Sequence, residues 1–408
     1  MNQPNGQSNV TVAGPTRFGF FIAPYHPLNG NPTLQIQRDL ELVELADRLG
    51  FAEAWVGEHH SAGMEIIAAP EVFLAAAAQR TQQIRLGTGV NSLPYHQPMM
   101  LADRLALADH LSKGRMMMGI GPGQLASDAA MMGVPPARQR EMMHESLEAL
   151  APLLRGEVVS AKTDWFELND ARLQLLPYQQ DGIELAVAST ISPSGAVLAG
   201  KHGAGLLSLA ASDPSGYEAL MPNWKVYEQT MAANGHTVNR AKWRLVAPMH
   251  IAETREQARR EAEWGVGHLV DYMKRLSGME MPWGDTAAAA VEQWTGPGFP
   301  SFGRATIGTP DDAIATIEAL AQQSGGFGTF LVLGLNVADW DATQRSARLF
   351  AEHVIPHFTR ANRNREASLN WANDNSERFM TGLRAGIEAA FEKHGQALAA
   401  ALQPEEGN

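Results

Sequence analysis

The sequence predicts a (β/α)8 barrel with insertions, in which eight parallel strands alternate with helices and close into a ring. Short apolar runs alternate with helical patterns along most of the 408 residues, as is typical of βα units in a parallel sheet. Eight such runs can be counted, and the length of the chain suits one barrel with insertions. A doubly wound open sheet is the second interpretation of the same alternation.

The strands are predicted where a short apolar run is bounded by turn residues or by a helical pattern. In chain order they cover residues 18–23, 54–56, 83–90, 115–120, 183–188, 204–209, 244–251 and 328–334. Amphipathic helices are predicted over 34–49, 99–111 and 138–154. A further helix opens near Ser192 and Pro193, because proline suits the first helical position.

The barrel is expected to span residues 17–358. Residues 1–16 are polar, lack the apolar centre of a signal peptide and are predicted to form a disordered tail. Residues 156–178 form an excursion. Residues 277–304 form a long irregular stretch rich in Met, Trp, Phe, Gly and Pro, which favours a lid. Residues 359–408 are predicted to be a helical extension.

Two of these regions have predicted elements of their own. The excursion is expected to contain short strands around Trp165–Phe166 and Leu173–Leu175. The extension is expected to contain a helix from about Ser376 to Leu402, which packs on the barrel or on a second subunit.

Composition excludes several classes of function. The formal net charge is −12, which argues against binding to nucleic acid or to an anionic membrane. No cysteine is present, so disulfides, thiolate metal sites and cysteine nucleophiles are excluded. No apolar run approaches the ~18 residues of a membrane span. We therefore expect a cytoplasmic protein.

The segment Glu58-His59-His60 directly follows the second predicted strand. The carboxyl ends of barrel strands are where active sites are built, so these three residues are candidates for chemistry. A metal site is not predicted, because no His-x-x-x-His pair or similar third ligand follows. The alternative is that one histidine caps a helix or satisfies a buried polar contact.

The third and fourth strands end in glycine. Gly87, Gly89, Val90 and Asn91 end the third strand, and the fourth runs into Gly121. Glycine in a strand indicates a bulge or a close approach of the backbone to a ligand, and a tight barrel corner is the alternative. Neither the dinucleotide fingerprint nor the Walker pattern is present, which disfavours ATP, GTP and a Rossmann-bound NAD.

An anion site is predicted after the fifth strand. Ser189 and Thr190 are followed by Ser192, Ser194 and Gly195 at the start of a helix. Free N–H groups and hydroxyls at a helix start bind phosphate. A simple helix cap by Ser192 would have the same sequence, so that alternative stays open.

Most methionines are expected to fill the core. Met131 and Met132 lie after the fourth strand and are candidates for lining an apolar substrate pocket. Trp283 and Phe299, in the predicted lid, are candidates for closing over that pocket.

Taken in order, these motifs resemble the luciferase-like superfamily of flavin-dependent monooxygenases, and most closely its limonene-monooxygenase-like branch. The resemblance covers roughly residues 17–358. It depends on the motifs named above and on Leu111-Ser112-Lys113-Gly114-Arg115, Ala199-Gly200-Lys201-His202-Gly203 and Ile307-Gly308-Thr309-Pro310.

The resemblance implies a barrel that binds reduced FMN supplied by a separate NAD(P)H-dependent reductase. The flavin reacts with O2 to give a flavin hydroperoxide, which oxygenates a small hydrophobic substrate, for example a terpene such as limonene. His59 would support this intermediate, a non-prolyl cis peptide would fall on Gly89–Val90, and the chain would form a homodimer.

The site residues implied for the flavin are Glu58, Gly89, Val90, Asn91, Gly121, Ser189, Thr190, Ser192, Ser194 and Gly195. Those implied for the substrate pocket are His60, Met131, Met132, Trp283 and Phe299.

Three alternatives remain open. Luciferase has an arginine for the flavin phosphate where this chain has Pro122, which shifts phosphate binding to the serine-lined helix start and leaves FAD possible. Hydride transfer, as in deazaflavin-dependent relatives, would keep the fold without oxygen chemistry. A non-catalytic flavin-binding partner subunit is the third.

Overall fold

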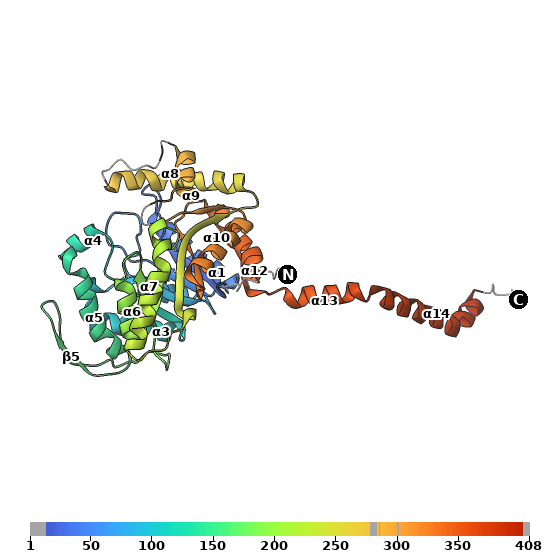
Figure 1. Cartoon of the computed structure of the whole chain (residues 1–408), viewed down its shortest axis with the longest axis horizontal. Helices are drawn as coiled ribbons and strands as arrows, with labels where there is room; N and C mark the ends of the chain where they lie inside the picture. Colours follow the sequence, from blue (N-terminus) through green and yellow to red (C-terminus); the bar gives the residue numbers. More distant parts are fainter. Residues whose placement is uncertain (1–13, 278–283, 285, 300–301, 403–408) are drawn as a thin grey trace, which may run out of the picture. The chain divides into compact units, whose positions relative to one another are not determined.

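The computed structural model of the chain describes residues 14–277, 284, 286–299 and 302–402 (Figure 1). The chain divides into two compact units, one ending at Phe358 and the other beginning at Thr359.

The first unit is a closed parallel barrel, as the sequence predicts. Each strand pairs in parallel with the next, and the last pairs with the first, so no open sheet edge remains in the ring. In ring order the strands are β1 (Arg17–Ile22), β2 (Glu53–Val56), β3 (Arg85–Ser92), β4 (Met116–Gly121), β7 (Glu184–Ser189), β8 (Gly205–Ser208), β9 (Trp243–Ile251) and β11 (Thr329–Gly334). These match the eight predicted runs, and the doubly wound sheet is wrong. A short strand, β10 (Thr306–Gly308), extends β9 outside the ring.

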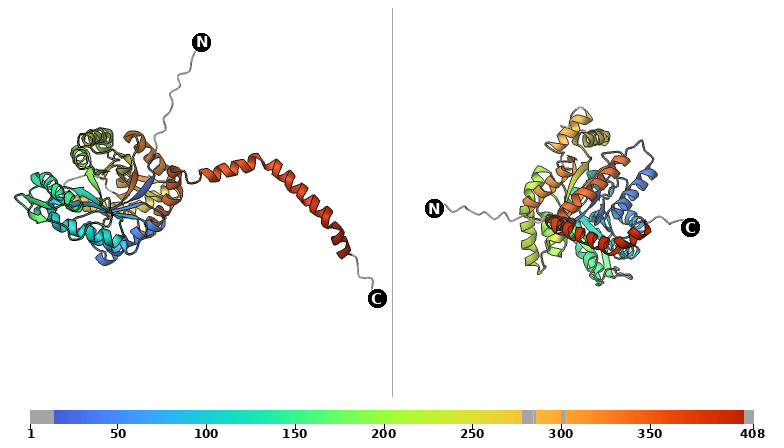
Figure 2. Two further views of the ribbon diagram at one scale, coloured as in Figure 1. Left: turned by 90° about the horizontal axis from the view of Figure 1, so that it is seen from below. Right: turned by 90° about the vertical axis from the view of Figure 1, so that its right-hand side faces the viewer.

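Helices surround the strands (Figure 2). They are α1 (Pro32–Arg48), α2 (Pro70–Ala78), α3 (Pro98–Ser112), α4 (Ala126–Met131), α5 (Gln139–Leu154), α6 (Ser194–His202), α7 (Pro214–Ala233), α8 (Arg255–Ser277), α9 (Ala287–Thr295), α10 (Pro310–Ser324), α11 (Trp340–Leu349) and α12 (Ile355–Thr359). Short 3-10 turns cover Leu93–Tyr95, Pro136–Arg138 and Arg240–Lys242, and a π-helical turn covers Phe350–Val354. Several helices begin at a side-chain cap, for example Asp213 before α7 and Thr309 before α10.

Strand side chains alternate between two apolar layers. Phe20 and Leu86 face the helices, whereas Phe21, Trp55 and Met117 fill the barrel interior. Gly87 makes room for this filling, because a side chain there would place its first carbon 2.4 Å from the Trp55 ring. The interior is therefore packed and apolar midway along the strands.

The excursion is a β-hairpin, but its strands differ from those predicted. They are β5 (Val159–Lys162) and β6 (Glu167–Ala171), so Trp165–Phe166 lies in the turn and Leu173–Leu175 lies outside a strand. The turn is set by Thr163, whose hydroxyl accepts hydrogen bonds from the backbone N–H groups of both Trp165 and Phe166. Figure 1 shows the hairpin at the opposite end of the barrel from α8.

The predicted irregular stretch contains a helix. Thr286 caps α9, whose Trp294 stacks on Phe299 with ring centroids 5.1 Å apart. Both rings are buried and join the apolar cluster that fills the barrel interior. Trp283 lies outside the described residues.

The second unit consists of two helices, α13 (Arg363–Asp374) and α14 (Ser376–Ala401). The structure confirms the predicted helix over about 376–402, and α13 lies in the same stretch, 359–408, that was predicted to be a helical extension. Within the described part of the chain, no helix is long and apolar enough to cross a membrane.

Candidate active site

Loops after three neighbouring strands meet at the carboxyl end of the barrel. Glu58, His59 and His60 follow β2, His96 follows β3, and Asp128 lies on α4 after β4. Only Glu58, His59 and His60 were predicted from the sequence. The signal for the other two was their position after a strand, since βα loops of a barrel converge at one end.

Carboxyl groups flank the His59 ring on both sides. Its Nδ1 atom lies 3.1 Å from Oδ2 of Asp128, and its Nε2 atom lies 3.4 Å from Oε1 of Glu65. Oδ1 of Asp128 also accepts hydrogen bonds from the backbone N–H of His60 and from the hydroxyl of Ser61. Asp128 therefore fixes both the ring of His59 and the backbone that carries it.

Glu58 is buried and is held by two other imidazoles. Its carboxylate lies 3.1 Å from Nε2 of His60 and 2.9 Å from Nε2 of His96. Burial opposes ionisation of Glu58, but the hydrogen bonds from His60 and His96 outweigh it and lower the pKa of the carboxyl. The hydrogen bond between His60 and Glu58 also raises the pKa of His60, although burial of His60 acts in the opposite direction.

The network continues to Arg104 and Glu71. Arg104 donates to Oε1 of Glu71 at 2.7 Å and to Nδ1 of His96 at 3.1 Å. Because a guanidinium can only donate, Nδ1 of His96 accepts and its Nε2–H donates to Glu58. This chain of contacts assigns the tautomer of His96. A direct contact of Glu58 with a flavin stays a prediction.

The peptide bond between Gly89 and Val90 is cis, at the position that the resemblance implied. The register between β3 and β4 shifts here, between Thr88 and Asn91. Asn91 donates to Glu58 at 3.2 Å, while its buried Oδ1 atom has no hydrogen-bond partner. Gly121 is required for packing, since a side chain there would place its first carbon 2.5 Å from Val90.

The predicted anion site lies where α6 begins against the end of β7. A side chain at Gly195 would place its first carbon 2.3 Å from the carbonyl oxygen of Ala188, so glycine lets the helix start close to the strand. The Ser192 hydroxyl accepts from the backbone N–H of Ser194 at 3.3 Å, but Pro193 stands at the N-cap position and no side chain caps the helix, so the capping alternative is wrong. The buried hydroxyl of Ser189 has no partner. Thr190 and Ser192 are exposed.

Four of the five predicted substrate-pocket residues lie in the described part of the chain, and their surroundings differ. Met131 and Met132 are 67% and 41% exposed, whereas Phe299 is buried against Trp294. His60 packs edge-on against Tyr95, with ring centroids 5.8 Å apart. A role for these four residues in binding substrate stays a prediction.

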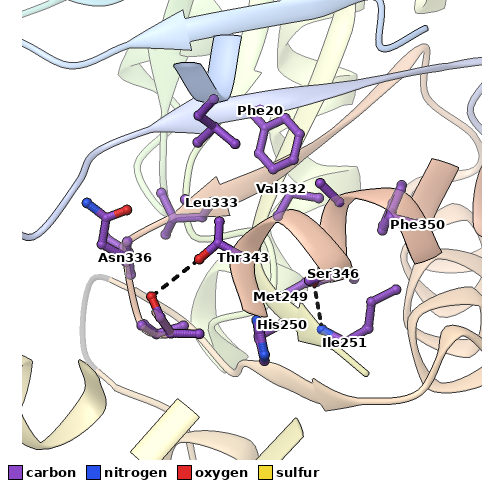
Figure 3. Close-up of a pocket in the computed structure, with 16 residues that line it drawn as sticks. Phe20, Met249, His250, Ile251, Val332, Leu333, Asn336, Thr343, Ser346 and Phe350 are labelled. Atoms are coloured by element: carbon purple, nitrogen blue, oxygen red, sulfur yellow. Dashed lines mark hydrogen bonds between the residues drawn. The ribbon is translucent and has the colours of Figure 1, made fainter. Parts of the chain in front are cut away.

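A separate pocket lies outside the barrel interior, between the ends of β9 and β11 and helix α11 (Figure 3). Phe20, Met249, Val332 and Phe350 line it, and they belong to the layer between strands and helices. Ser346 accepts a hydrogen bond from the backbone N–H of Ile251 at its edge. No predicted site residue lines this pocket. It is therefore a different place from the site formed by His59, His60 and His96.

Comparison with known proteins now identifies the class. The family model of the luciferase-like monooxygenases matches residues 16–326. The chain belongs to this family, and it is a monooxygenase by class, as the sequence predicted.

Individual relatives cover most of the chain. Limonene 1,2-monooxygenase from Rhodococcus erythropolis is 50% identical over 345 residues, which are 85% of this chain and 87% of the relative. The 4-hydroxyprotoasukamycin monooxygenase of Streptomyces nodosus subsp. asukaensis is 42% identical over 359 residues, 87% of this chain and 95% of the relative. The crystal structure of the monooxygenase RslO1 from Streptomyces bottropensis has a TM-score of 0.71 at 25% identity, covering 84% of this chain and 99% of that one.

Proposed function

We propose that this chain is the oxygenase component of a two-component flavin monooxygenase. It takes reduced FMN from a separate NAD(P)H-dependent reductase and uses O2 to oxygenate a small hydrophobic compound, for example a monocyclic terpene such as limonene. The observation that carries this proposal is a histidine, His59, held between two acids at the mouth of an apolar barrel, in a chain half identical to a limonene 1,2-monooxygenase.

The residues at the mouth of the barrel fit a flavin. Two buried polar atoms lack partners there, the hydroxyl of Ser189 beside α6 and Oδ1 of Asn91 beside the cis peptide. The first N–H groups of α6 have no acceptor within the helix. Ser189, Ser192, Ser194 and Gly195 would hold the phosphate, and Asn91 would face the polar edge of the ring. When bound, reduced flavin supplies the electrons that activate O2.

The chain itself supplies a positioned imidazole and a dry interior. Asp128 keeps His59 in one orientation, so the Nε2 atom of the ring stays at a fixed point. Phe21, Trp55 and Met117 fill the barrel below and exclude water from that point. This combination suits protonation control at an oxygen atom beside an apolar substrate.

The names of relatives motivate the cofactor and the partner. The oxygenating constituent of 3,6-diketocamphane monooxygenase from Pseudomonas putida, which shares the fold, is known in complex with FMN. The trigonelline monooxygenase of Acinetobacter baylyi, which matches 35% of this chain, is named as an oxygenase component. The homodimer, the cytoplasmic location and the choice of FMN over FAD remain predictions.

The test is anaerobic titration with photoreduced FMN, and in parallel with reduced FAD, followed by mixing with oxygenated buffer and limonene or a cyclic ketone. We expect reduced FMN to bind and oxygen uptake to yield an oxygenated product. Substrate oxidation without oxygen uptake would indicate hydride transfer instead. Binding without turnover of any kind would indicate a non-catalytic partner subunit.

A further inference from the structure

Glu65 lies beside the ring of His59, the candidate catalytic residue, on the side opposite Asp128. It follows β2 in the same loop as His59, and its Oε1 atom lies 3.4 Å from Nε2 of the ring. Its other oxygen occupies the space left by Gly57, where a side chain would place its first carbon 2.6 Å away and 3.7 Å from the carbonyl oxygen of Gly89. The carboxyl group is thus enclosed between the imidazole and the end of the barrel strands.

The contacts of Asp128 place one hydrogen on the Nδ1 atom of His59. Asp128 accepts from the backbone of His60 and from Ser61, and it faces Nδ1 of His59, so that nitrogen carries a hydrogen. A neutral ring then presents a lone pair at Nε2. A carboxylate at Glu65 would repel that lone pair, whereas a carboxylic acid would donate a hydrogen bond to it.

The surroundings of Glu65 agree with the protonated form. Burial raises the pKa of this carboxyl, and the negative charges of Asp39 and Asp128 raise it further, while His59 and His26 lower it. Asp39 is itself engaged by His26 at 2.7 Å. Tyr272, on α8, interacts electrostatically with the same carboxyl group.

We propose that Glu65 is a positioning residue that stores the proton used by His59, an inference that rests on the proposed function. The O–H bond of Glu65 breaks and its electron pair stays on oxygen, while the Nε2 lone pair forms the new N–H bond. The result is a carboxylate at Glu65 and an imidazolium between two carboxylates. The Nε2–H bond then breaks as the proton passes to an oxygen acceptor beside the ring, so the imidazole is neutral again, and the Glu65 carboxylate regains its proton from water after turnover.

The test compares Glu65→Gln with wild type. Glutamine fills the same space and donates a hydrogen bond to Nε2, but it cannot release a proton. The matched control is Glu318→Gln on α10, an exposed glutamate that pairs with His357. A second substitution, Glu65→Met, keeps the measurement possible if the glutamine variant does not fold.

The first readout needs no flavin. In infrared difference spectra at neutral pH, we expect wild type and Glu318→Gln to show the C=O stretch of a protonated carboxyl that shifts in D2O, and the Glu65 variants to lack it. If the spectra of wild type and the Glu65 variants are the same, the proposal is wrong whether or not the protein proves to be an oxygenase.

The second readout is the pH profile of kcat for oxygenation. In Glu65→Gln, His59 must take its proton from solvent. We therefore expect kcat to fall roughly 10- to 100-fold once the pH exceeds the pKa of a free histidine side chain. KM and the affinity for reduced FMN should stay within about twofold. A wild-type pH profile in Glu65→Gln would overturn the proposal. If wild type forms no oxygenated product, the proposed function fails and the infrared result alone decides the role of Glu65.

Discussion

The two ends of the barrel both hold buried charges, but they hold them differently. At the amino end, the fully buried Arg244 lies 2.6 Å from Glu53 and 2.8 Å from Glu184, and Arg85 lies 2.8 Å from Glu184. At the carboxyl end, the groups that face carboxylates are mostly imidazoles, namely His59, His60 and His96.

The difference separates a structural cluster from a chemical one. Burial would raise the pKa of Glu184, but Arg244 and Arg85 outweigh it and lower the pKa to about 2, so the amino-end charges stay constant at neutral pH. Imidazoles gain and lose protons near neutral pH. The carboxyl end can therefore move protons, whereas the amino end cannot.

The contrast would fail if the amino-end cluster proved unimportant for folding. We expect Arg244→Met to lower the free energy of unfolding by about 3–5 kcal/mol, because the buried Glu53 loses its nearest guanidinium partner and keeps only Arg17, 3.9 Å away. Urea denaturation measures this. The control Lys162→Met removes an exposed pair with Glu167 and should change stability by less than about 1 kcal/mol. A similar small change in Arg244→Met would contradict the structural role.

The carboxyl-end cluster should affect turnover and leave folding intact. We expect His59→Asn to lower kcat for oxygenation by roughly 10²- to 10⁴-fold, because the positioned proton donor is lost. The unfolding midpoint and the Kd for reduced FMN should change little. His357→Asn, which removes an exposed histidine, is the control. If His59→Asn retained normal coupling of oxygen uptake to product, His59 would not be catalytic.

The helix start at α6 offers a smaller effect on binding. In Gly195→Ala, the new methyl group would meet the carbonyl oxygen of Ala188 and displace the first turn of the helix. We expect reduced FMN to bind roughly tenfold more weakly, a loss of about 1.4 kcal/mol, measured by anaerobic titration. Gly382→Ala is the control, because no atom lies near a side chain at that position. Equal affinity in both variants would remove the phosphate assignment.

The smallest effect concerns the pH dependence of stability. The pKa of His60 is raised in the folded state from its ordinary value of 6.5. The stability that this contributes is complete below pH 6.5 and is lost as the pH rises through the folded-state pKa. The pKa of Glu58 is lowered in the folded state from its ordinary value of 4.5. The stability that this contributes is complete above pH 4.5 and is lost as the pH falls through the folded-state pKa. The difference in unfolding free energy between wild type and Glu58→Gln should therefore be largest between these two values. A difference independent of pH would show that the pair is not coupled as the distances indicate.

Local patterns explain why the strands could be predicted and some insertions could not. The barrel strands are apolar on both faces, so they appear as continuous runs. The hairpin depends on one hydroxyl of Thr163, and the apolar pattern placed its strands on Trp165–Phe166 instead. Helix α9 follows a stretch rich in glycine and proline, which concealed its short apolar face.

The site was predictable only where it is local in sequence. Glu58, His59 and His60 stand together after one strand, and the peptide bond at Gly89–Val90 follows from the resemblance. Asp128 reaches His59 across 69 residues, and this contact depends on β2 and β4 both pairing with β3, which brings the loops that follow them together. Arg244 and Glu53, which are 191 residues apart, meet only because the last strand pairs with the first and closes the barrel.

The central claim is that the carboxyl end of this barrel transfers oxygen to a substrate. The direct measurement is turnover of limonene with reduced FMN under labelled ¹⁸O₂, followed by mass spectrometry of the product, for wild type and His59→Asn side by side. We predict one labelled oxygen atom per product molecule in wild type and little product from the variant. Unlabelled product, or peroxide alone in place of product across terpenes and cyclic ketones, would contradict the assignment.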